Sequence, residues 1–218
     1  MARRRRTLQI AKKAVGIDSN YEPVTKAAFE YREAHVYPYL IAKGLTVEKL
    51  QGALARRGYV APKAKQAGVV YLTGVGHGAY DSYTGHIYDP IFTVGQYLSS
   101  ESQGKIVHLL SCQTGRDLGP DFVQNGCKAY FGYDENFTFF TDTQDIFFEC
   151  DSEIDLAFAD GLTAEQVYTR VVEKFQHHID AMYAAGKIYV AEMLAYNRDH
   201  LRCPSSGGSD WGNPKAKL

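Results

Sequence analysis

The chain alternates short, strongly apolar runs with longer segments of helical composition. The runs at 69–74, 105–111 and 128–132 are bounded by glycine or small residues, which is typical of buried strands in a parallel sheet. Two weaker strands are predicted at 7–17 and 45–50. Because these runs alternate with helical segments, the pattern predicts an α/β fold, with a mostly parallel sheet and helices on both faces.

Glycine and proline mark the ends of the predicted helices. Pro23 stands where a helix can begin, and Gly44 ends a helical stretch over 24–43 that Pro38 must kink or break. A long loop is expected between the runs at 69–74 and 105–111. Further helices are predicted over 53–66, 119–124, 141–160, 163–185 and 187–202.

A length of 218 residues fits one domain with a single core. We expect a basic arm and weak first strand over 1–17, the domain over 18–203, and a flexible tail of linker composition over 204–218. The run Arg3 to Arg6 could bind nucleic acid or an anionic membrane, although terminal runs of this kind are more often solvated.

Charge and cysteine content narrow the class of protein. The net charge of −1 predicts no general attraction to nucleic acid. Lys12 and Lys13 interrupt the one stretch that could be a signal peptide, and nothing approaches transmembrane length, so no membrane partner is expected. The four cysteines are too few and too irregularly spaced for a disulfide framework. We therefore expect reduced thiols and a cytoplasmic location.

Two of the apolar runs end in reactive side chains. The run at 69–74 leads to His77-Gly78, and the run at 105–111 leads to Cys112. Because the carboxyl ends of parallel strands meet at one edge of a sheet, a base and a thiol could meet there. His77 could activate the thiol or protonate a leaving amine, and the Gly78 and Cys112 amides could form an oxyanion hole. Taken singly, each residue is more often structural than catalytic.

These residues carry a resemblance to a known family. The segments 70–78 (VYLTGVGHG) and 106–115 (IVHLLSCQTG) resemble the catalytic blocks of caspase-like cysteine peptidases, a group that includes caspases, metacaspases, gingipains, clostripain, separase and the CHAT proteases. The Ser-Cys-x-Thr-Gly form and the segment 125–133 are most similar to CHAT and gingipain-like members. The resemblance covers 69–133. The family's first strand has no clean match, because the segment 8–15 carries two lysines.

The resemblance implies a caspase-like three-layer sandwich and a Cys-His dyad made of Cys112 and His77, with Gly78 contributing to the oxyanion hole. It implies a protein or peptide substrate and no cofactor. We therefore expect a cysteine endopeptidase that works through a thioester acyl-enzyme. The alternative is a catalytically inactive binding or scaffold protein with the same fold. Activation by a regulatory protein partner, by self-cleavage or by calcium stays open.

Two other motifs overlap the histidine. The segment 74–79 satisfies the dinucleotide fingerprint G-x-G-x-x-A, but turn residues follow it where the fingerprint requires a helix. A zinc site made of His77, His86, Cys112 and Cys127 is conceivable, although the chain has no short ligand pair such as C-x-x-C. We expect neither site.

An acidic segment follows the strand at 128–132. No lysine or arginine occurs from Ala129 to Thr169, where ten acidic residues fall. Several family members cut after arginine or lysine, which requires a carboxylate in the substrate pocket. We therefore consider Asp134 or Asp142 as residues that bind a basic substrate side chain, with Arg3 to Arg6 as a self-cleavage site. Solvated helix faces are the simpler explanation, and a calcium site would need a ligand spacing that no loop shows.

Overall fold

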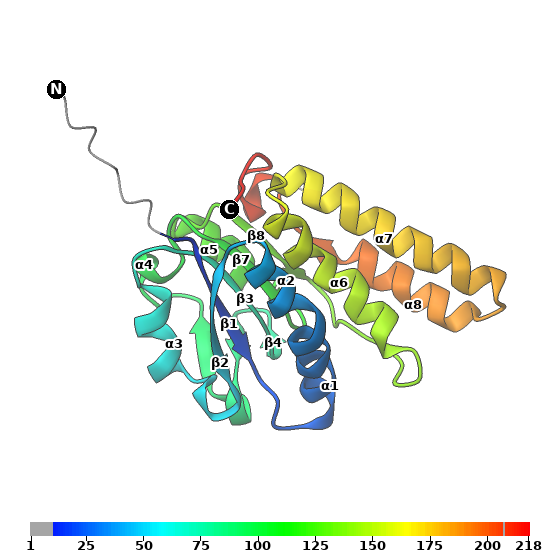
Figure 1. Cartoon of the computed structure of the whole chain (residues 1–218), viewed down its shortest axis with the longest axis horizontal. Helices are drawn as coiled ribbons and strands as arrows, with labels where there is room; N and C mark the ends of the chain where they lie inside the picture. Colours follow the sequence, from blue (N-terminus) through cyan, green and yellow to red (C-terminus); the bar gives the residue numbers. More distant parts are fainter. Residues whose placement is uncertain (1–10, 207) are drawn as a thin grey trace.

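The computed structural model describes residues 11–206 and 208–218. Within them, a central sheet has six strands in the order β2-β1-β3-β7-β8-β9. The strands are β1 (Lys13–Asp18), β2 (Thr46–Gln51), β3 (Val69–Val75), β7 (Ile106–Leu110), β8 (Ala129–Tyr133) and β9 (Leu201–Arg202). All pairings are parallel except that of β8 with the two-residue β9. The predicted mostly parallel sheet is confirmed (Figure 1).

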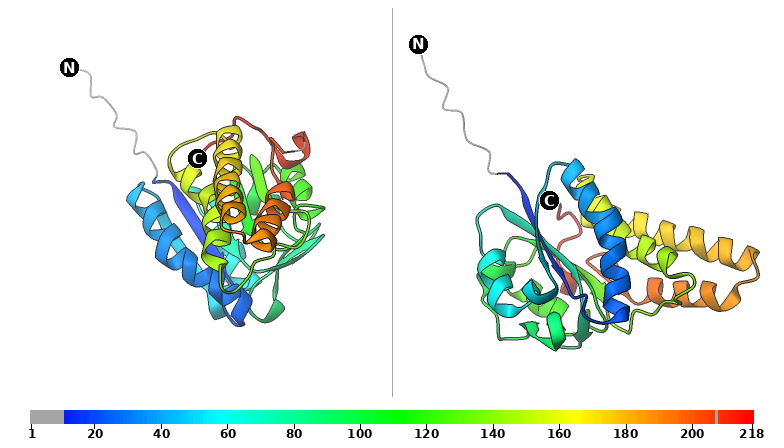
Figure 2. Two further views of the ribbon diagram at one scale, coloured as in Figure 1. Left: turned by 90° about the vertical axis from the view of Figure 1, so that its right-hand side faces the viewer. Right: turned by 60° about the horizontal axis from the view of Figure 1, so that its bottom comes forward.

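Two groups of helices cover the two faces of this sheet (Figures 1 and 2). On one face lie α1 (Pro23–Tyr31), α2 (Tyr37–Ala42) and α6 (Gln144–Ala159), with α7 (Ala164–Ala184) and α8 (Ile188–Asp199) packed against α6 and against each other. On the other face lie α3 (Arg57–Ala64) and α5 (Leu118–Gln124), and the short α4 (Ser99–Ser102) contacts α3. Each face buries its own apolar cluster, as expected for an α/β fold with helices on both faces.

The long helix predicted over 24–43 is divided by a π-helical turn, η1 (Arg32–Val36). The turn inserts one extra residue into the helix, a form often found at functional sites. Pro38 lies in the first turn of α2, immediately after the irregularity, where its missing N–H costs little. The turn also brings the side chain of Arg32 into the core, where it is 1 % exposed.

The segment between β3 and β7 is not the plain loop that the sequence predicts. It forms a second, antiparallel sheet of β4 (His77–Ala79), β5 (Ser82–Thr84) and β6 (Pro90–Thr93), with a short 3-10 turn, η3 (His86–Tyr88). Strands of three or four residues are too short to show a period of two. Tyr83, Ile91 and Phe92 anchor this small sheet in the core under α3 and α5.

The two ends of the predicted domain also differ from expectation. Residue 17 lies inside β1, a strand that pairs with both β2 and β3. The described part of the tail is packed and not free: Trp211 Nε1 donates to the Gly115 carbonyl at 2.8 Å, and Asn213 N–H donates to the Lys128 carbonyl at 2.8 Å. These hydrogen bonds hold the tail against the domain, although its composition is typical of a flexible linker. The run Arg3 to Arg6 lies outside the described residues.

A buried ionic network joins the sheet to the helices on one face. The Arg32 guanidinium contacts Asp18 at 3.2 Å and Asp155 at 2.9 Å, and donates to the Thr73 hydroxyl at 2.7 Å. His108 lies 3.2 Å from Asp155 on one side and 3.2 Å from Asp151 on the other. All these side chains are 0–1 % exposed, so β1, β3, β7, the π turn and α6 are locked together by charge as well as by apolar packing.

The charges in this network reinforce one another. Burial disfavours the protonated imidazole of His108, but Asp151 and Asp155 outweigh that effect and raise its pKa to about 9. Burial also opposes ionisation of Asp155, yet Arg32 and His108 hold its pKa below the ordinary value. Asp18 accepts a hydrogen bond from the Val75 N–H at 3.2 Å, so the network reaches the carboxyl end of β3. None of the helices in the described ranges has the length and apolar character needed to cross a membrane.

Candidate active site

The strand register places His77 and Cys112 at equivalent positions, just beyond the ends of two adjacent strands. In the parallel pair of β3 and β7, Val75 lies opposite Leu110, and each reactive residue follows two positions after its strand's last paired residue. The ladder continues one step further, because the Gly76 N–H donates to the Leu110 carbonyl at 3.2 Å. Both residues therefore emerge at the carboxyl edge of the central sheet.

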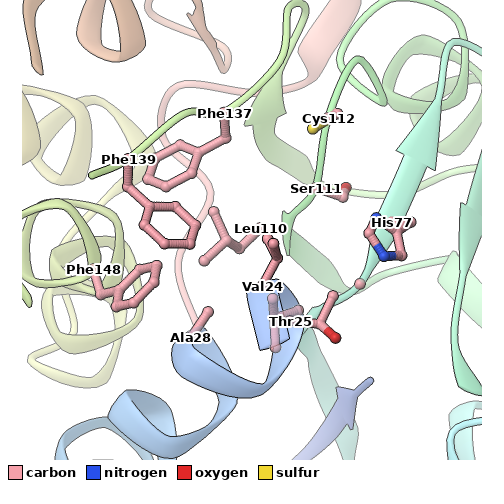
Figure 3. Close-up of a pocket in the computed structure, with 12 residues that line it drawn as sticks. Val24, Thr25, Ala28, His77, Leu110, Ser111, Cys112, Phe137, Phe139 and Phe148 are labelled. Atoms are coloured by element: carbon pink, nitrogen blue, oxygen red, sulfur yellow. The ribbon is translucent and has the colours of Figure 1, made fainter. Parts of the chain in front are cut away.

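His77 and Cys112 line the same cavity (Figure 3). The cavity opens between the start of α1, the ends of β3 and β7, and the segment that joins β8 to α6. Figure 3 shows the imidazole and the thiol on one side of it, with three phenylalanine rings on the other. Its lining consists of Val24, Thr25, Ala28, Val75, Gly76, His77, Leu110, Ser111, Cys112, Phe137, Phe139 and Phe148.

The turn after Cys112 explains the Ser-Cys-x-Thr-Gly sequence. Gln113 adopts a left-handed conformation with φ of 62°, which turns the chain sharply after the thiol. The Thr114 hydroxyl makes hydrogen bonds with Ser111 at 2.8 Å and with Tyr130 at 2.7 Å. A Cβ on Gly115 would lie 2.9 Å from the Tyr133 backbone, so glycine is needed for this close approach to β8. The turn holds Cys112 in a fixed position.

Gly78 lies directly against the backbone of Cys112. A Cβ at Gly78 would be 2.2 Å from the Cys112 carbonyl oxygen and 2.7 Å from the Thr114 methyl group. No other residue type fits at such distances without a backbone shift. The two residues considered for an oxyanion hole are thus neighbours.

The surroundings of Cys112 favour the neutral thiol. Burial raises its pKa, and a hydrogen bond from the Phe137 backbone N–H offsets this only in part. Cys112 is nonetheless the most accessible of the four cysteines, because Cys127, Cys150 and Cys203 are buried. A thiol in this state needs a nearby base before it can act as a nucleophile.

His77 contacts an acidic and an aromatic neighbour, Glu22 and Tyr88. Its Nε2 lies 3.3 Å from Glu22 Oε1, an ion-pair contact rather than an aligned hydrogen bond. Tyr88 stacks on the imidazole with ring centroids 5.1 Å apart and an interplanar angle of 24°. Tyr88 itself has φ of 58°, a strained conformation next to Ile87 with φ of 51°.

Glu22 connects this site to the helix that borders it. Its carboxylate caps α1, accepting from Thr25 N–H at 2.7 Å and from Val24 N–H at 2.9 Å. Burial opposes its ionisation, but these N–H groups and the charge of His77 lower its pKa. One signal for it exists in the sequence: an acidic residue before a helix-starting proline, just after the first strand.

The two carboxylates considered for substrate binding do not line the cavity beside Cys112. Asp134 faces the strand pair β8–β9, where it accepts from Arg202 Nε at 2.6 Å and lies 2.9 Å from His200 Nδ1. Asp142 lines a separate hollow between the start of α6 and the end of α7. Asp151 and Asp155, which were expected on a solvated helix face, are fully buried. Three aromatic residues from 137–148 border the thiol instead.

The residues considered for a dinucleotide site and for a zinc site are also described by the structure. Residues 77–79 form strand β4, so the helix required by a dinucleotide fingerprint is replaced by a hairpin. Cys127 is buried, and its thiol faces the carbonyls of Lys105 and Ala129. Among the residues that the structure describes, no three His, Cys, Asp or Glu side chains are grouped to hold a metal ion.

Comparison of the chain with protein-family models gave no match, and comparison with curated proteins gave none either.

Proposed function

We propose that the chain is a cysteine endopeptidase with a Cys112-His77 dyad on a caspase-like sandwich. The observation that carries this proposal is the shared cavity at the ends of two adjacent parallel strands, bordered by one imidazole and one thiol. Gly78 packs closely against the Cys112 backbone, so the two residues proposed to supply the amides of an oxyanion hole are neighbours. The raised pKa of Cys112 fits a mechanism in which the base acts during attack rather than before it.

The reaction follows from the roles of these groups. His77 takes the proton from the Cys112 thiol as sulfur attacks the substrate carbonyl carbon. The negative charge that develops on oxygen receives hydrogen bonds from the Gly78 and Cys112 N–H groups. His77 then gives its proton to the leaving amine, the C–N bond breaks, and a thioester remains on sulfur. Water, deprotonated by His77, hydrolyses the thioester and releases the acid product.

Glu22 and Tyr88 act through His77. With Nε2 held against Glu22, the other ring nitrogen, Nδ1, is the one that exchanges a proton with the thiol in this mechanism. The carboxylate favours the imidazolium that forms in each transition state. Tyr88 covers one face of the ring and limits its rotation. We regard both as positioning residues.

Alkylation of the thiols by iodoacetamide between pH 5 and 10 tests the dyad. We expect Cys112 to react fastest, because burial holds the pKa of Cys127 at about 12 and that of Cys203 at about 11. His77→Ala is expected to shift the Cys112 profile to higher pH and to slow labelling at pH 7 about tenfold or more. The matched control is His177→Ala, an exposed histidine on α7.

The readout is the rate of labelling at each cysteine, measured by mass spectrometry of peptides. Should Cys112 react no faster than the buried thiols, or His77→Ala leave its profile unchanged, the dyad is contradicted. A non-catalytic scaffold would then be the better explanation.

A further inference from the structure

The cavity beside the dyad is lined mostly by apolar side chains, with Thr25 and Ser111 as the polar lining residues besides His77 and Cys112. Val24 and Ala28 of α1, Leu110 of β7, and the rings of Phe139 and Phe148 surround it. Figure 3 shows these side chains gathered opposite His77 and Cys112. Ala28, Leu110 and Phe148 are 1–4 % exposed, so the floor is part of the folded core. A group that enters the cavity leaves water for hydrocarbon.

A substrate reaches this cavity because of where the thiol lies. When Cys112 attacks a peptide carbonyl, the side chain next to that carbonyl lies within a few ångströms of the sulfur. The residues that border both the sulfur and the imidazole are the walls that this side chain meets. The cavity therefore contacts the side chain of the residue immediately before the scissile bond.

A charged substrate side chain would find no ionic partner among the described residues that line the cavity. Among the described lining residues, none carries a carboxylate, a guanidinium or an ammonium group. The adjacent carboxylate, Glu22, already accepts two backbone N–H groups and contacts His77. Asp134 is paired with Arg202, and Asp142 lies in another hollow. An arginine, lysine or aspartate side chain would lose its hydration without gaining an ionic partner.

We infer that this site accepts substrates with an apolar residue immediately before the cleaved bond. This inference rests on the proposed function and replaces the basic residue that the acidic segment suggested. The Phe137-x-Phe139 segment and the α1 residues Val24 and Ala28 are the specificity determinants. They act on the side chain of the substrate, whereas Cys112 and His77 act on its carbonyl.

Peptidyl chloromethyl ketones that differ only in the residue next to the reactive group test the inference. Leucine, arginine, aspartate and phenylalanine versions are incubated with the full chain, and the second-order rate of Cys112 alkylation is followed by mass spectrometry. We expect the leucine and phenylalanine reagents each to react at least tenfold faster than the arginine and aspartate reagents. A faster reaction with the arginine or aspartate reagent overturns the inference, while His77-dependent labelling of Cys112 would keep the proposed function standing.

A substitution at the mouth of the cavity provides a second, independent test. Val24 is 53 % exposed and lies in the first turn of α1, where an acidic residue is tolerated. Val24→Asp is expected to raise the rate of the arginine reagent relative to the leucine reagent at least tenfold. The matched control, Ile41→Asp, changes a residue of α2 that is 54 % exposed and outside the cavity lining. An equal shift in both variants, or none in Val24→Asp, overturns the assignment of this cavity.

Failure of the chemistry is distinguishable from failure of the specificity. If no reagent alkylates Cys112 and iodoacetamide shows no His77 dependence, both the function and the inference fall. If Cys112 is alkylated with His77 dependence but at equal rates by all four reagents, only the inference falls.

Discussion

Replacing Cys112 by alanine is expected to lower kcat for hydrolysis of a mixed fluorogenic peptide library by about 10⁴-fold or more. In the proposed mechanism this sulfur atom forms the covalent intermediate, and the other three cysteines lie outside the cavity lining. His77→Ala removes the base that a neutral thiol requires, and is expected to lower kcat about 10²–10⁴-fold. The rates are measured with the purified full chain under steady-state conditions.

The control for these kinetics is His177→Ala, which should keep the full rate. Thermal unfolding of each variant separates lost chemistry from lost structure, since Cys112 is only partly buried and its truncation should leave the fold intact. A Cys112→Ala enzyme that retains more than about a hundredth of the wild-type rate would contradict a thiol nucleophile.

Removing one charge from the buried network is the second large effect that we expect. Arg32→Met leaves Asp18 and Asp155 without their common partner in a region closed to water. Breaking a buried pair in this way typically costs about 3–5 kcal/mol of unfolding free energy. The measurement is urea unfolding at pH 6. Arg32→Met should also disturb the position of His77, because Asp18 accepts a hydrogen bond from the N–H of Val75, two residues before His77.

The matched control is Lys26→Met, which breaks the pair of Lys26 and Glu30 on α1. These side chains are 60 % and 62 % exposed and 3.7 Å apart, so the expected loss is below about 1 kcal/mol. Similar losses in the two variants would show that the network adds nothing beyond surface electrostatics.

The same network predicts how stability depends on pH. His108 has a folded pKa of about 9, above its ordinary value of 6.5, so folding favours its protonated form. The contribution of His108 to the unfolding free energy is complete below about pH 6.5 and is lost as pH rises towards 9. We expect the unfolding free energy to fall by on the order of 3 kcal/mol over this range, and much less in His108→Gln. A flat profile in the wild-type chain would contradict the charged state of His108 between Asp151 and Asp155.

The central part of the fold follows from local sequence, because buried parallel strands leave a strong apolar signal. The runs that became β3, β7 and β8 also fix the edge at which His77 and Cys112 meet. β1 was displaced relative to prediction: it begins at Lys13 and extends to Asp18, with the lysine at its open start and the aspartate buried. Hydrophobicity alone does not predict a strand that ends on a buried carboxylate.

The buried network and the surroundings of the site depend on contacts between segments far apart in the sequence, which local patterns do not show. Asp151 and Asp155 carry the same charge as exposed helix residues, and only their partners Arg32 and His108, far away in the chain, make them core residues. Likewise, Glu22 matters because it contacts His77, and Phe137 and Phe139 after β8 matter because they line the cavity. The acidic composition of that segment suggested a basic substrate, whereas its side chains at the cavity are phenylalanines.

The most direct test of the account is the covalent intermediate itself. A mixture of azapeptide esters, whose acyl-enzymes hydrolyse slowly, is added to the full chain, and the acid-quenched protein is analysed by intact-mass and peptide mass spectrometry. The account predicts one carbazoyl group per chain, bound to Cys112 as a thiocarbazate, and its absence from the His77→Ala protein. Acylation at another residue, or none on a folded chain, would contradict it.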